Sequence, residues 1–262
     1  MKTGIIIPCY NEAERINSQA FIDFILQEKE YHLCFVNDGS KDNTLQVLEN
    51  IQRQCPTRVI VIDVKQNAGK AAAVRSGARY LYNDSAIGYI GFLDADLSTD
   101  FTDLKKLVQT LKDNYKLQMV YGSRRKGGEI KRDFLRNFLS NIIKSIIHLI
   151  LGLPIEDTQC GAKVFRRGII PTAYGKAFIT RWLFDVEIFI RLKNTFGRKY
   201  TMEITQEQAL ERWVHVEDSK LGIKDSLMIP YRLITIWVAY TLRPVVSASM
   251  PTTFQPNLAT SF

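Results

Sequence analysis

The sequence contains few of the residues that build metal centres and disulfide frameworks. Its 262 residues include only 4 cysteines and 3 histidines. Cys9, Cys34, Cys55 and Cys160 are scattered, form no CxxC pair and have no histidine at ligand spacing. These absences argue against a zinc site and against a disulfide framework, so we expect reduced thiols.

Long apolar runs are also missing. The first eight residues contain three isoleucines before Pro8, which is too little for the core of a secretory signal. The stretch 227–246 is apolar, but only ten uncharged residues separate Arg232 from Arg243, whereas a helix needs about 20 to span a bilayer. We therefore expect no membrane-spanning helix, and a protein that is cytoplasmic and peripheral to the membrane.

The composition does favour a folded, basic protein. Hydrophobic residues make up 46% of the chain, enough for a substantial core. The formal net charge is +8 and the sequence pI is near 9.3. A positive charge of this size indicates an anionic partner, which could be nucleic acid, an anionic membrane surface or a nucleotide-sugar.

Strand and helix signals alternate through the first half of the chain. Apolar, β-branched runs predict strands at 4–7, 33–36, 58–64, 87–93 and 117–121. Segments of helical periodicity predict helices at 12–29, 42–52, 71–81 and 103–112. Repeated units of this kind predict a mostly parallel α/β sheet, with helices on both faces and ligands at the carboxyl ends of the strands.

Two carboxylates, Asp94 and Asp96, directly follow the predicted strand at 87–93. An aspartate in this position is most often a turn former or a helix cap, and an isolated pair would favour that interpretation. On an extended backbone, however, the two side chains would point the same way and could face one divalent cation.

Polar loops follow the other predicted strands as well, at residues 8–12, 37–44 and 67–70. Each loop alone fits ordinary turn chemistry. Together with the acidic pair they make four loops at one edge of a sheet. This convergence predicts a shared pocket for a base, a ribose and a diphosphate.

The ordered motifs resemble those of the family 2 inverting glycosyltransferases of GT-A fold. The segments that carry the resemblance are IPCYNE, VNDGSKDNT, NAGKAAAVRSGA, FLDADLS and YGSR. Three later segments, DTQCGAKVFRR, RWLFDVE and DSKL, resemble the branch that acts on polyprenyl phosphates. The resemblance implies a GT-A fold, a UDP-sugar donor rather than GDP-mannose, and Mg²⁺ or Mn²⁺ as cofactor.

The resemblance also implies which residues bind the donor. The positions matched to the nucleotide site are Pro8, Tyr10, Glu12, Asp38 and Lys70. The DxD pair matches the metal site, with Asp96 expected to ligate the ion directly and Asp94 to face the ribose or donor. The chain departs from many relatives at Asn37, where they have a second aspartate before DGS.

The acceptor phosphate is expected to have its own basic site. The positions matched to it are Arg124, Arg136, Ser140 and Lys220. Arg136 and Ser140, four residues apart, would share one helix face. A solvated basic face is the simpler explanation for any single arginine, but further basic residues at 125, 126, 131 and 132 support an anionic partner.

Asp157 is matched to a carboxylate near the reaction centre. A phosphate monoester loses its second proton near about pH 6, so its oxygen is already a nucleophile at neutral pH. A strong general base is then unnecessary. We expect Asp157 to orient a substrate more than to accept a proton.

The expected organisation is one glycosyltransferase domain at 1–222, with a nucleotide-sugar half at 1–123 and an acceptor half at 124–222. An amphipathic helix at 223–246 and a disordered tail at 247–262 are expected to follow. The segment 135–150 has a broad isoleucine-rich stripe. The stripe fits either a protein core or a helix lying in the membrane interface.

Three functions follow from these patterns. The first is inverting transfer of a hexose, with glucose expected, from a UDP-sugar to a polyprenyl phosphate at a membrane surface, with no nucleic-acid partner. The second is transfer to a soluble or glycan acceptor. The third is a catalytically silent nucleotide-sugar-binding module, against which the intact Asp94 and Asp96 argue.

Overall fold

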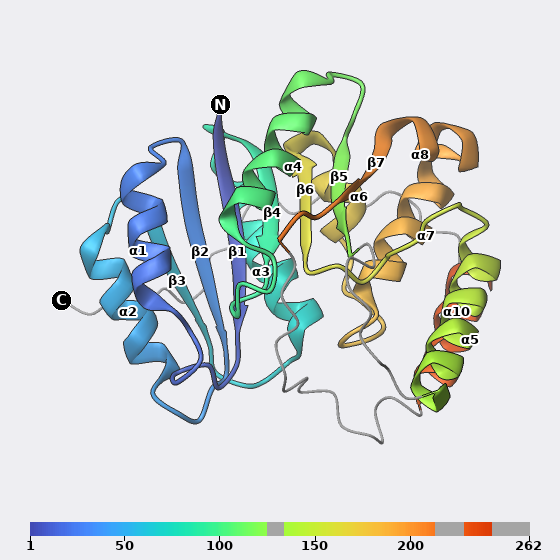
Figure 1. Cartoon of the computed structure of the whole chain (residues 1–262), viewed down its shortest axis with the longest axis horizontal. Coiled ribbons are helices and arrows are strands. Elements are labelled where there is room, and N and C mark those ends of the chain that lie inside the picture. Colours follow the sequence, from blue (N-terminus) through green and yellow to red (C-terminus); the bar gives the residue numbers. More distant parts are fainter. Residues whose placement is uncertain (125–133, 213–227, 243–262) are drawn as a thin grey trace.

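The described part of the chain is built around one seven-stranded sheet. The computed structural model describes residues 1–124, 134–212 and 228–242, and for 134–142 it describes the backbone only. The strands are β1 (Lys2–Cys9), β2 (Tyr31–Asp38), β3 (Val59–Val64), β4 (Ile87–Leu93), β5 (Met119–Ser123), β6 (Ala162–Arg166) and β7 (Thr205–Ala209). Their order is β3-β2-β1-β4-β6-β5-β7, and only β6 runs antiparallel to its neighbours. The predicted mostly parallel sheet is thereby confirmed (Figure 1).

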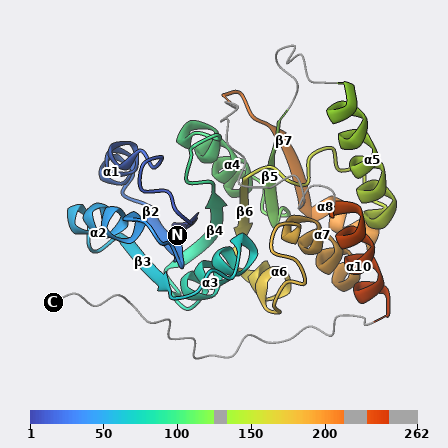
Figure 2. The ribbon, with the colours of Figure 1, turned by 90° about the horizontal axis from the view of Figure 1, so that it is seen from below.

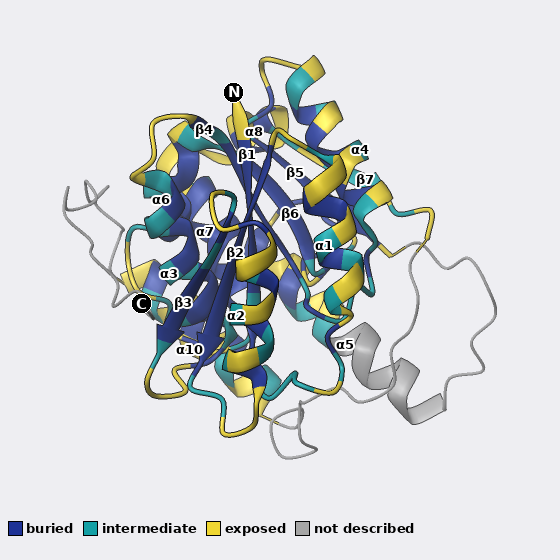
Figure 3. Ribbon diagram, turned by 90° about the vertical axis from the view of Figure 1, so that its left-hand side faces the viewer, coloured by how far each residue is buried: buried dark blue, intermediate teal, exposed yellow. Residues whose placement is uncertain are grey.

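Helices cover both faces of the sheet, as predicted. They are α1 (Ser18–Gln27), α2 (Thr44–Gln54), α3 (Lys70–Tyr82), α4 (Phe101–Asp113), α5 (Phe134–Leu151), η1 (Arg167–Ile169), α6 (Ile170–Tyr174), α7 (Phe184–Phe196), α8 (Arg198–Ile204) and α10 (Ile229–Leu242). Figure 2 shows α1, α2 and α4 on one face and α3, α6 and α7 on the other. Each face has its own apolar core, so strands β1 to β6 are mostly buried (Figure 3), whereas the edge strand β7 has no fully buried residue.

The sequence predicted most element positions but placed one helix start wrongly. The strand predicted at 87–93 has the same bounds as β4, and the bounds of the other predicted strands lie within two residues of those observed. The helix predicted from residue 12 begins only at Ser18. Asn17 caps it by accepting a hydrogen bond from the N–H of Ala20. The residues before it are held in a loop at the candidate site.

The arrangement of parallel strands determines where that site lies. β1, β2, β3 and β4 are parallel, so their carboxyl ends meet at one edge, the lower edge in Figure 1. The donor residues expected from the sequence lie at these ends or after them. Across the described ranges no helix is long and apolar enough to cross a membrane. The tail predicted to be disordered, 247–262, lies outside the described residues.

Candidate active site

The loops that follow β1 and β2 are hydrogen-bonded to each other. The N–H of Asn11 donates to Ser40 Oγ at 3.0 Å, and the N–H of Glu12 donates to Thr44 Oγ1 at 2.7 Å. Asn11 has φ of 50°, a left-handed conformation that asparagine tolerates better than most residues. These contacts hold Tyr10 and Glu12 beside the end of β2. A helix that began at residue 12, as predicted, would have carried these residues away from β2.

Asp38 ends β2 and builds the loop that follows β3. Its side-chain oxygens accept the N–H groups of Ala68 at 2.8 Å and Gly69 at 2.7 Å, and its backbone carbonyl accepts a bond from Asn67 Nδ2. Pro8, in β1, pairs with the neighbouring part of β2. The contact of Asp38 with a nucleotide base stays a prediction. The hydrogen bonds to the Asp38 carboxylate do fix the shape of the loop that follows β3.

Lys70 and Asp94 form an ion pair at the start of α3 and the end of β4. Lys70 Nζ lies 2.5 Å from Asp94 Oδ1. Burial acts to lower the pKa of Lys70, but the negative charges of Asp94, Asp185 and Asp96 outweigh it and hold this pKa above its ordinary value. Lys70 is therefore a permanent cation at the edge of the sheet where β4 ends, and its contact with a donor diphosphate stays a prediction.

The two carboxylates of the DxD pair are not presented by an extended strand, and that part of the sequence argument was wrong. β4 ends at Leu93, and a turn follows in which the N–H of Leu97 donates to the carbonyl of Asp94 at 3.2 Å. Leu97 has φ of 52°. Asp96 Oδ1 accepts the N–H of Ser98, and Asp96 Oδ2 lies 3.9 Å from Arg15 Nη2. Asp94 and Asp96 therefore contact cations from different loops.

The acidic pair suits a hard divalent cation. Each side chain is about a quarter exposed, at 28% for Asp94 and 26% for Asp96. Carboxylate oxygens are preferred ligands of Mg²⁺ and Mn²⁺, and Mg²⁺ is usually held by one or two carboxylates plus substrate phosphates. Among the described residues no group of three or more His, Cys, Asp or Glu side chains could hold a metal ion. Because Asp94 is engaged with Lys70, Asp96 is the better candidate for direct ligation.

Gly161, directly before β6, packs against Asp94, which follows the neighbouring strand β4. A Cβ at position 161 would lie 2.0 Å from Asp94 Oδ2 and 2.6 Å from Asp94 Cγ. No side chain fits there without displacing the carboxylate. Gly161 is therefore part of the site, although the sequence did not single it out.

Lys163 is a second unexpected residue beside the acidic pair. It is fully buried, and its Nζ lies 2.7 Å from both Asp185 Oδ1 and the backbone oxygen of Cys160. Burial raises the pKa of Asp185, although Lys163 and Lys70 oppose the shift. The N-cap of α7 is Leu183, and Asp185, in the first turn of this helix, pairs with Lys163.

Arg124 and Asp157 form a two-point ion pair at the end of β5. Arg124 Nε donates to Asp157 Oδ2 at 2.7 Å, and Arg124 Nη2 donates to Oδ1 at 2.8 Å. Burial acts to raise the pKa of Asp157, but the hydrogen bonds and charge of Arg124 hold it below its ordinary value. Asp157 is thus a poor proton acceptor, which supports the expectation that it orients a substrate.

The other residues expected at the acceptor phosphate lie in α5 or outside the described residues. Arg136 and Ser140 lie in α5, in the part whose backbone alone is described. Lys220 lies outside the described residues. Their contact with a lipid phosphate stays a prediction.

Asn37 has a specific partner in the neighbouring strand β3, Asp63. Its Nδ2 donates to Asp63 Oδ1 at 2.7 Å, and Asp63 Oδ2 lies 2.5 Å from Lys65 Nζ. Both Asn37 and Asp63 are buried and line a hollow of about 340 Å³ beside the start of α2. The amide donor is needed here because a carboxylate already occupies the facing position.

We expect an Asn37→Asp variant to be less stable than wild type by about 1–3 kcal/mol at pH 7, because a buried donor is lost and two carboxylates face each other. Mutual repulsion would raise the pKa of one of them. The loss of stability should therefore shrink as the pH falls through that raised pKa. Urea unfolding at pH 7 and pH 5 measures both effects. Asn50→Asp, on the exposed side of α2, is the control and should change stability little; equal losses in both variants would contradict the pairing.

The isoleucine stripe of α5 faces the protein where its side chains are described. Ile147 and Leu151 are buried, and Ile143, Ile146 and Ile150 pack against the same core. α5 lies against α7 and α10, as Figures 1 and 2 both show. Of the two possibilities that the sequence left open, the core accounts for this half of the stripe.

Similarity to known proteins agrees with the geometry. A sequence model of the family described as "Glycosyl transferase family 2" matches residues 4–172. A dolichyl-phosphate beta-glucosyltransferase of Dictyostelium discoideum is 30% identical over 258 residues, covering 89% of this chain and 76% of the relative. The protein of the same name from Saccharomyces cerevisiae is 29% identical, covering 91% of this chain and 75% of the relative.

Solved structures share the fold at low sequence identity. Glucosyl-3-phosphoglycerate synthase of Mycobacterium tuberculosis in complex with UDP superposes with a TM-score of 0.64 and 17% identity, covering 90% of this chain and 80% of that protein. The same enzyme with Mn²⁺, UDP and glucosyl-3-phosphoglycerate gives a TM-score of 0.63 and 17% identity, covering 91% and 79%. At this identity the likeness confirms the predicted GT-A fold.

Proposed function

The chain belongs to glycosyl transferase family 2, and we propose that it transfers a hexose, with glucose the expected sugar, from a UDP-sugar to a polyprenyl phosphate. The relatives named above as dolichyl-phosphate beta-glucosyltransferases support the sugar and the acceptor class, and the solved structures of similar fold in complex with UDP support the donor class. The observation that carries the proposal is the cluster of Lys70, Asp94 and Asp96 at the edge where β1, β2 and β4 end.

The residues of this cluster have distinct tasks in the proposed reaction. An acceptor phosphate oxygen forms a bond to the sugar C1 while the bond from C1 to the donor diphosphate breaks, with inversion at C1. Lys70 supplies a fixed positive charge near the diphosphate, where negative charge develops. Asp96, with Asp94 beside it, would hold Mg²⁺ or Mn²⁺, which as a Lewis acid stabilises the leaving group.

The acceptor side needs orientation more than proton transfer. The phosphate oxygen of the acceptor is already largely ionised at neutral pH. Arg124 is fixed by Asp157 through two hydrogen bonds, so its position is set before a substrate arrives. We propose that Arg124 directs the acceptor phosphate, together with Arg136, Ser140 and Lys220.

The surface of α10 supports a place at the membrane, which we propose to be its cytoplasmic face. Leu233, Ile236 and Tyr240 pack into the protein. The opposite face is largely apolar, with Thr235 and Thr241 among its exposed residues, and the charged residue of α10, Arg232, is half-buried. Its large exposed side chains are Tyr231, Ile234, Trp237, Val238 and Leu242. Aromatic and aliphatic side chains of this kind favour the lipid interface, where a long-chain acceptor would be found.

We expect Ile234→Glu to weaken binding to vesicles by roughly tenfold, because it places a charge in the face that would enter the lipid. Co-sedimentation with vesicles of phosphatidylcholine and phosphatidylglycerol measures the partitioning. Leu26→Glu, on α1, is a matched control, since Leu26 is 53% exposed and Ile234 is 54% exposed. Equal binding of the two variants would contradict the proposed orientation.

Radiolabelled donor distinguishes the candidate functions. UDP-glucose or GDP-mannose is incubated with undecaprenyl or dolichyl phosphate, with and without EDTA. Label from UDP-glucose that enters chloroform and is lost with EDTA supports the proposal. Label confined to a water-soluble product supports a soluble or glycan acceptor. Tight UDP binding without turnover would indicate a silent binding module.

A further inference from the structure

Arg181, just before α7, lies across the loop that joins β3 to α3. Its Nη2 donates to the backbone oxygen of Asn67 at 2.9 Å and also bonds the side-chain oxygen of Asn67. Its own backbone oxygen accepts the N–H of Ala71 at 3.0 Å. A Cβ at Gly69 would lie 2.8 Å from Arg181 Cβ, so a glycine is required for this close packing.

The loop that Arg181 contacts joins two residues expected to bind the donor. At one end the side chain of Asn67 donates to the backbone of Asp38. At the other end, α3 begins with Lys70, the partner of Asp94. The cap residue Gly69 offers no side chain to the first turn of α3, so the carbonyl of Arg181 satisfies one of its N–H groups.

We propose that Arg181 is a positioning residue for the nucleotide-sugar site, which it serves by holding the loop 67–70. The inference rests on the proposed function, since it assumes that Asp38 and Lys70 bind a UDP-sugar. Arg181 acts through the loop: it keeps Asp38 and Lys70 at a fixed separation before the donor arrives. Such preorganisation lowers the cost of ordering the site on binding.

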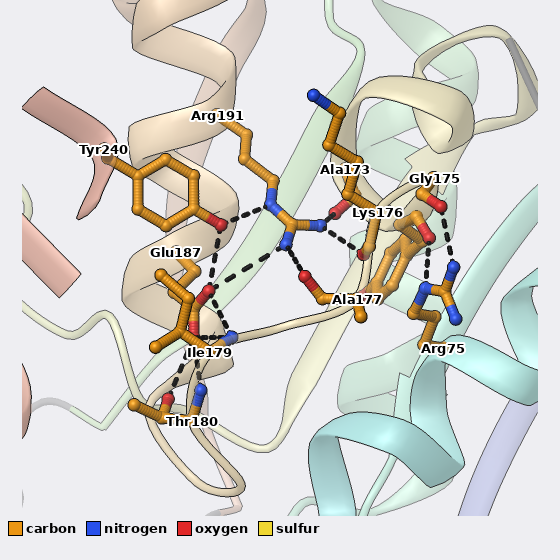
Figure 4. Close-up of polar contacts among 11 residues, drawn as sticks. Arg75, Ala173, Gly175, Lys176, Ala177, Ile179, Thr180, Glu187, Arg191 and Tyr240 are labelled. Carbon is orange, nitrogen blue, oxygen red and sulfur yellow. Dashed lines mark hydrogen bonds and ion pairs between the residues drawn. The ribbon is translucent and has the colours of Figure 1, made fainter. Parts of the chain in front are cut away.

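A buried carboxylate holds the segment that carries Arg181. Glu187, fully buried on α7, accepts the N–H groups of Ile179 and Thr180, the Thr180 hydroxyl at 2.9 Å and the Tyr240 hydroxyl at 2.9 Å (Figure 4). All four partners are donors. A glutamine at this position would point its side-chain NH₂ group at one of these donors. The uncharged isostere therefore cannot accept all four hydrogen bonds and cannot replace Glu187.

Two arginines hold the preceding turn. Arg191 is 1% exposed and donates to backbone oxygens of 173, 176 and 177 and, through Nε, to the Tyr240 hydroxyl. Arg75, on α3, donates to the backbone oxygens of 174 and 175. Figure 4 shows both guanidinium groups turned toward this one stretch of chain. The segment 173–181 is therefore anchored to α7 and to the helix that begins with Lys70, and the α7 side chains that hold it are bonded in turn to Tyr240 of α10.

Calorimetric titration with UDP in the presence of MnCl₂ tests the inference without turnover. Arg181→Ala should raise the Kd of UDP by roughly tenfold, because the loop loses preorganisation. The KM for UDP-glucose should rise by a similar factor, while kcat and the KM of the lipid acceptor change less. Arg198→Ala, at an exposed arginine on α8, is the matched control and should bind UDP as wild type does.

A second pair of variants separates positioning from general destabilisation. Glu187→Gln should weaken UDP binding in the same direction and also lower Tm, whereas Arg181→Lys, which keeps a donor, should recover part of the affinity lost in Arg181→Ala. If the wild-type protein binds UDP and Arg181→Ala binds it with the same Kd, the inference about Arg181 is overturned while the proposed function stands. A wild-type chain that binds no uridine nucleotide would overturn the proposed function and this inference with it.

Discussion

An Asp96→Asn variant is expected to lower kcat for sugar transfer by roughly a thousandfold while leaving the fold intact, the scale seen when a group that stabilises transition-state charge is removed. The physical reason is the loss of a hard anionic ligand. Asparagine offers one neutral oxygen, which binds Mg²⁺ or Mn²⁺ far more weakly than a carboxylate. Asp96 is partly exposed, so the substitution removes little packing.

The metal itself provides a readout independent of turnover. Electron paramagnetic resonance of Mn²⁺ titrated with protein and UDP should show a bound ion for wild type and much weaker binding for Asp96→Asn. Asp113→Asn, at the exposed end of α4, removes a carboxylate outside the site and is the control. Full activity of Asp96→Asn with unchanged Mn²⁺ binding would show that the ligand is another residue.

A Gly161→Ala variant should lose roughly a hundredfold in kcat/KM, because one added carbon pushes the Asp94 carboxylate from its place, and small displacements of positioned groups are costly. The Cβ would stand 2.0 Å from Asp94 Oδ2, well inside contact distance. Either Asp94 moves away from Lys70 or β6 shifts from β4. Both outcomes disturb the donor site.

Gly168→Ala is the matched control for this variant. A Cβ at Gly168 meets nothing within 4 Å, so it adds the same atom without a clash. Steady-state kinetics and thermal unfolding of both variants distinguish the cases. If Gly161→Ala keeps wild-type kcat/KM, Asp94 has no fixed position in the reaction.

Local sequence patterns were sufficient for strands β1 to β5 and for the polar loops that follow β1 to β4, but not for β6 and β7. β4 is a short apolar run followed directly by Asp94, and the loops after β1, β2 and β3 carry polar residues that neither strand nor helix needs. Parallel strands then bring their carboxyl ends together. Periodicity and turn chemistry are properties of neighbouring residues, so a single sequence contains them.

Contacts between distant segments could not be obtained in this way. The approach of Gly161 to Asp94, and of Arg181 to Asn67, depends on how β6 and α7 pack against the rest. The sequence argument for two carboxylates on one extended strand was wrong because a turn closes after Leu93. Its helix from residue 12 began too early, since hydrogen bonds from a distant loop hold these residues.

The apolar surfaces of α5 and α10 show the same difference between what a sequence contains and what only the fold determines. The stripe on α5 and the apolar run that became α10 were both visible in the sequence. Only their packing shows that Ile147 and Leu151 face the core whereas Ile234 and Trp237 face outward. Hydrophobicity is local, but burial is a property of the assembled fold.

The most direct test of the proposed reaction is the structure of its product. UDP-glucose, undecaprenyl phosphate and MnCl₂ are incubated with the protein, and the chloroform extract is examined by ³¹P and ¹H nuclear magnetic resonance. We predict a phosphodiester that carries one glucosyl group with the anomeric configuration inverted relative to the donor. An unchanged lipid phosphate monoester, with glucose transferred only to water-soluble material, would contradict the proposal.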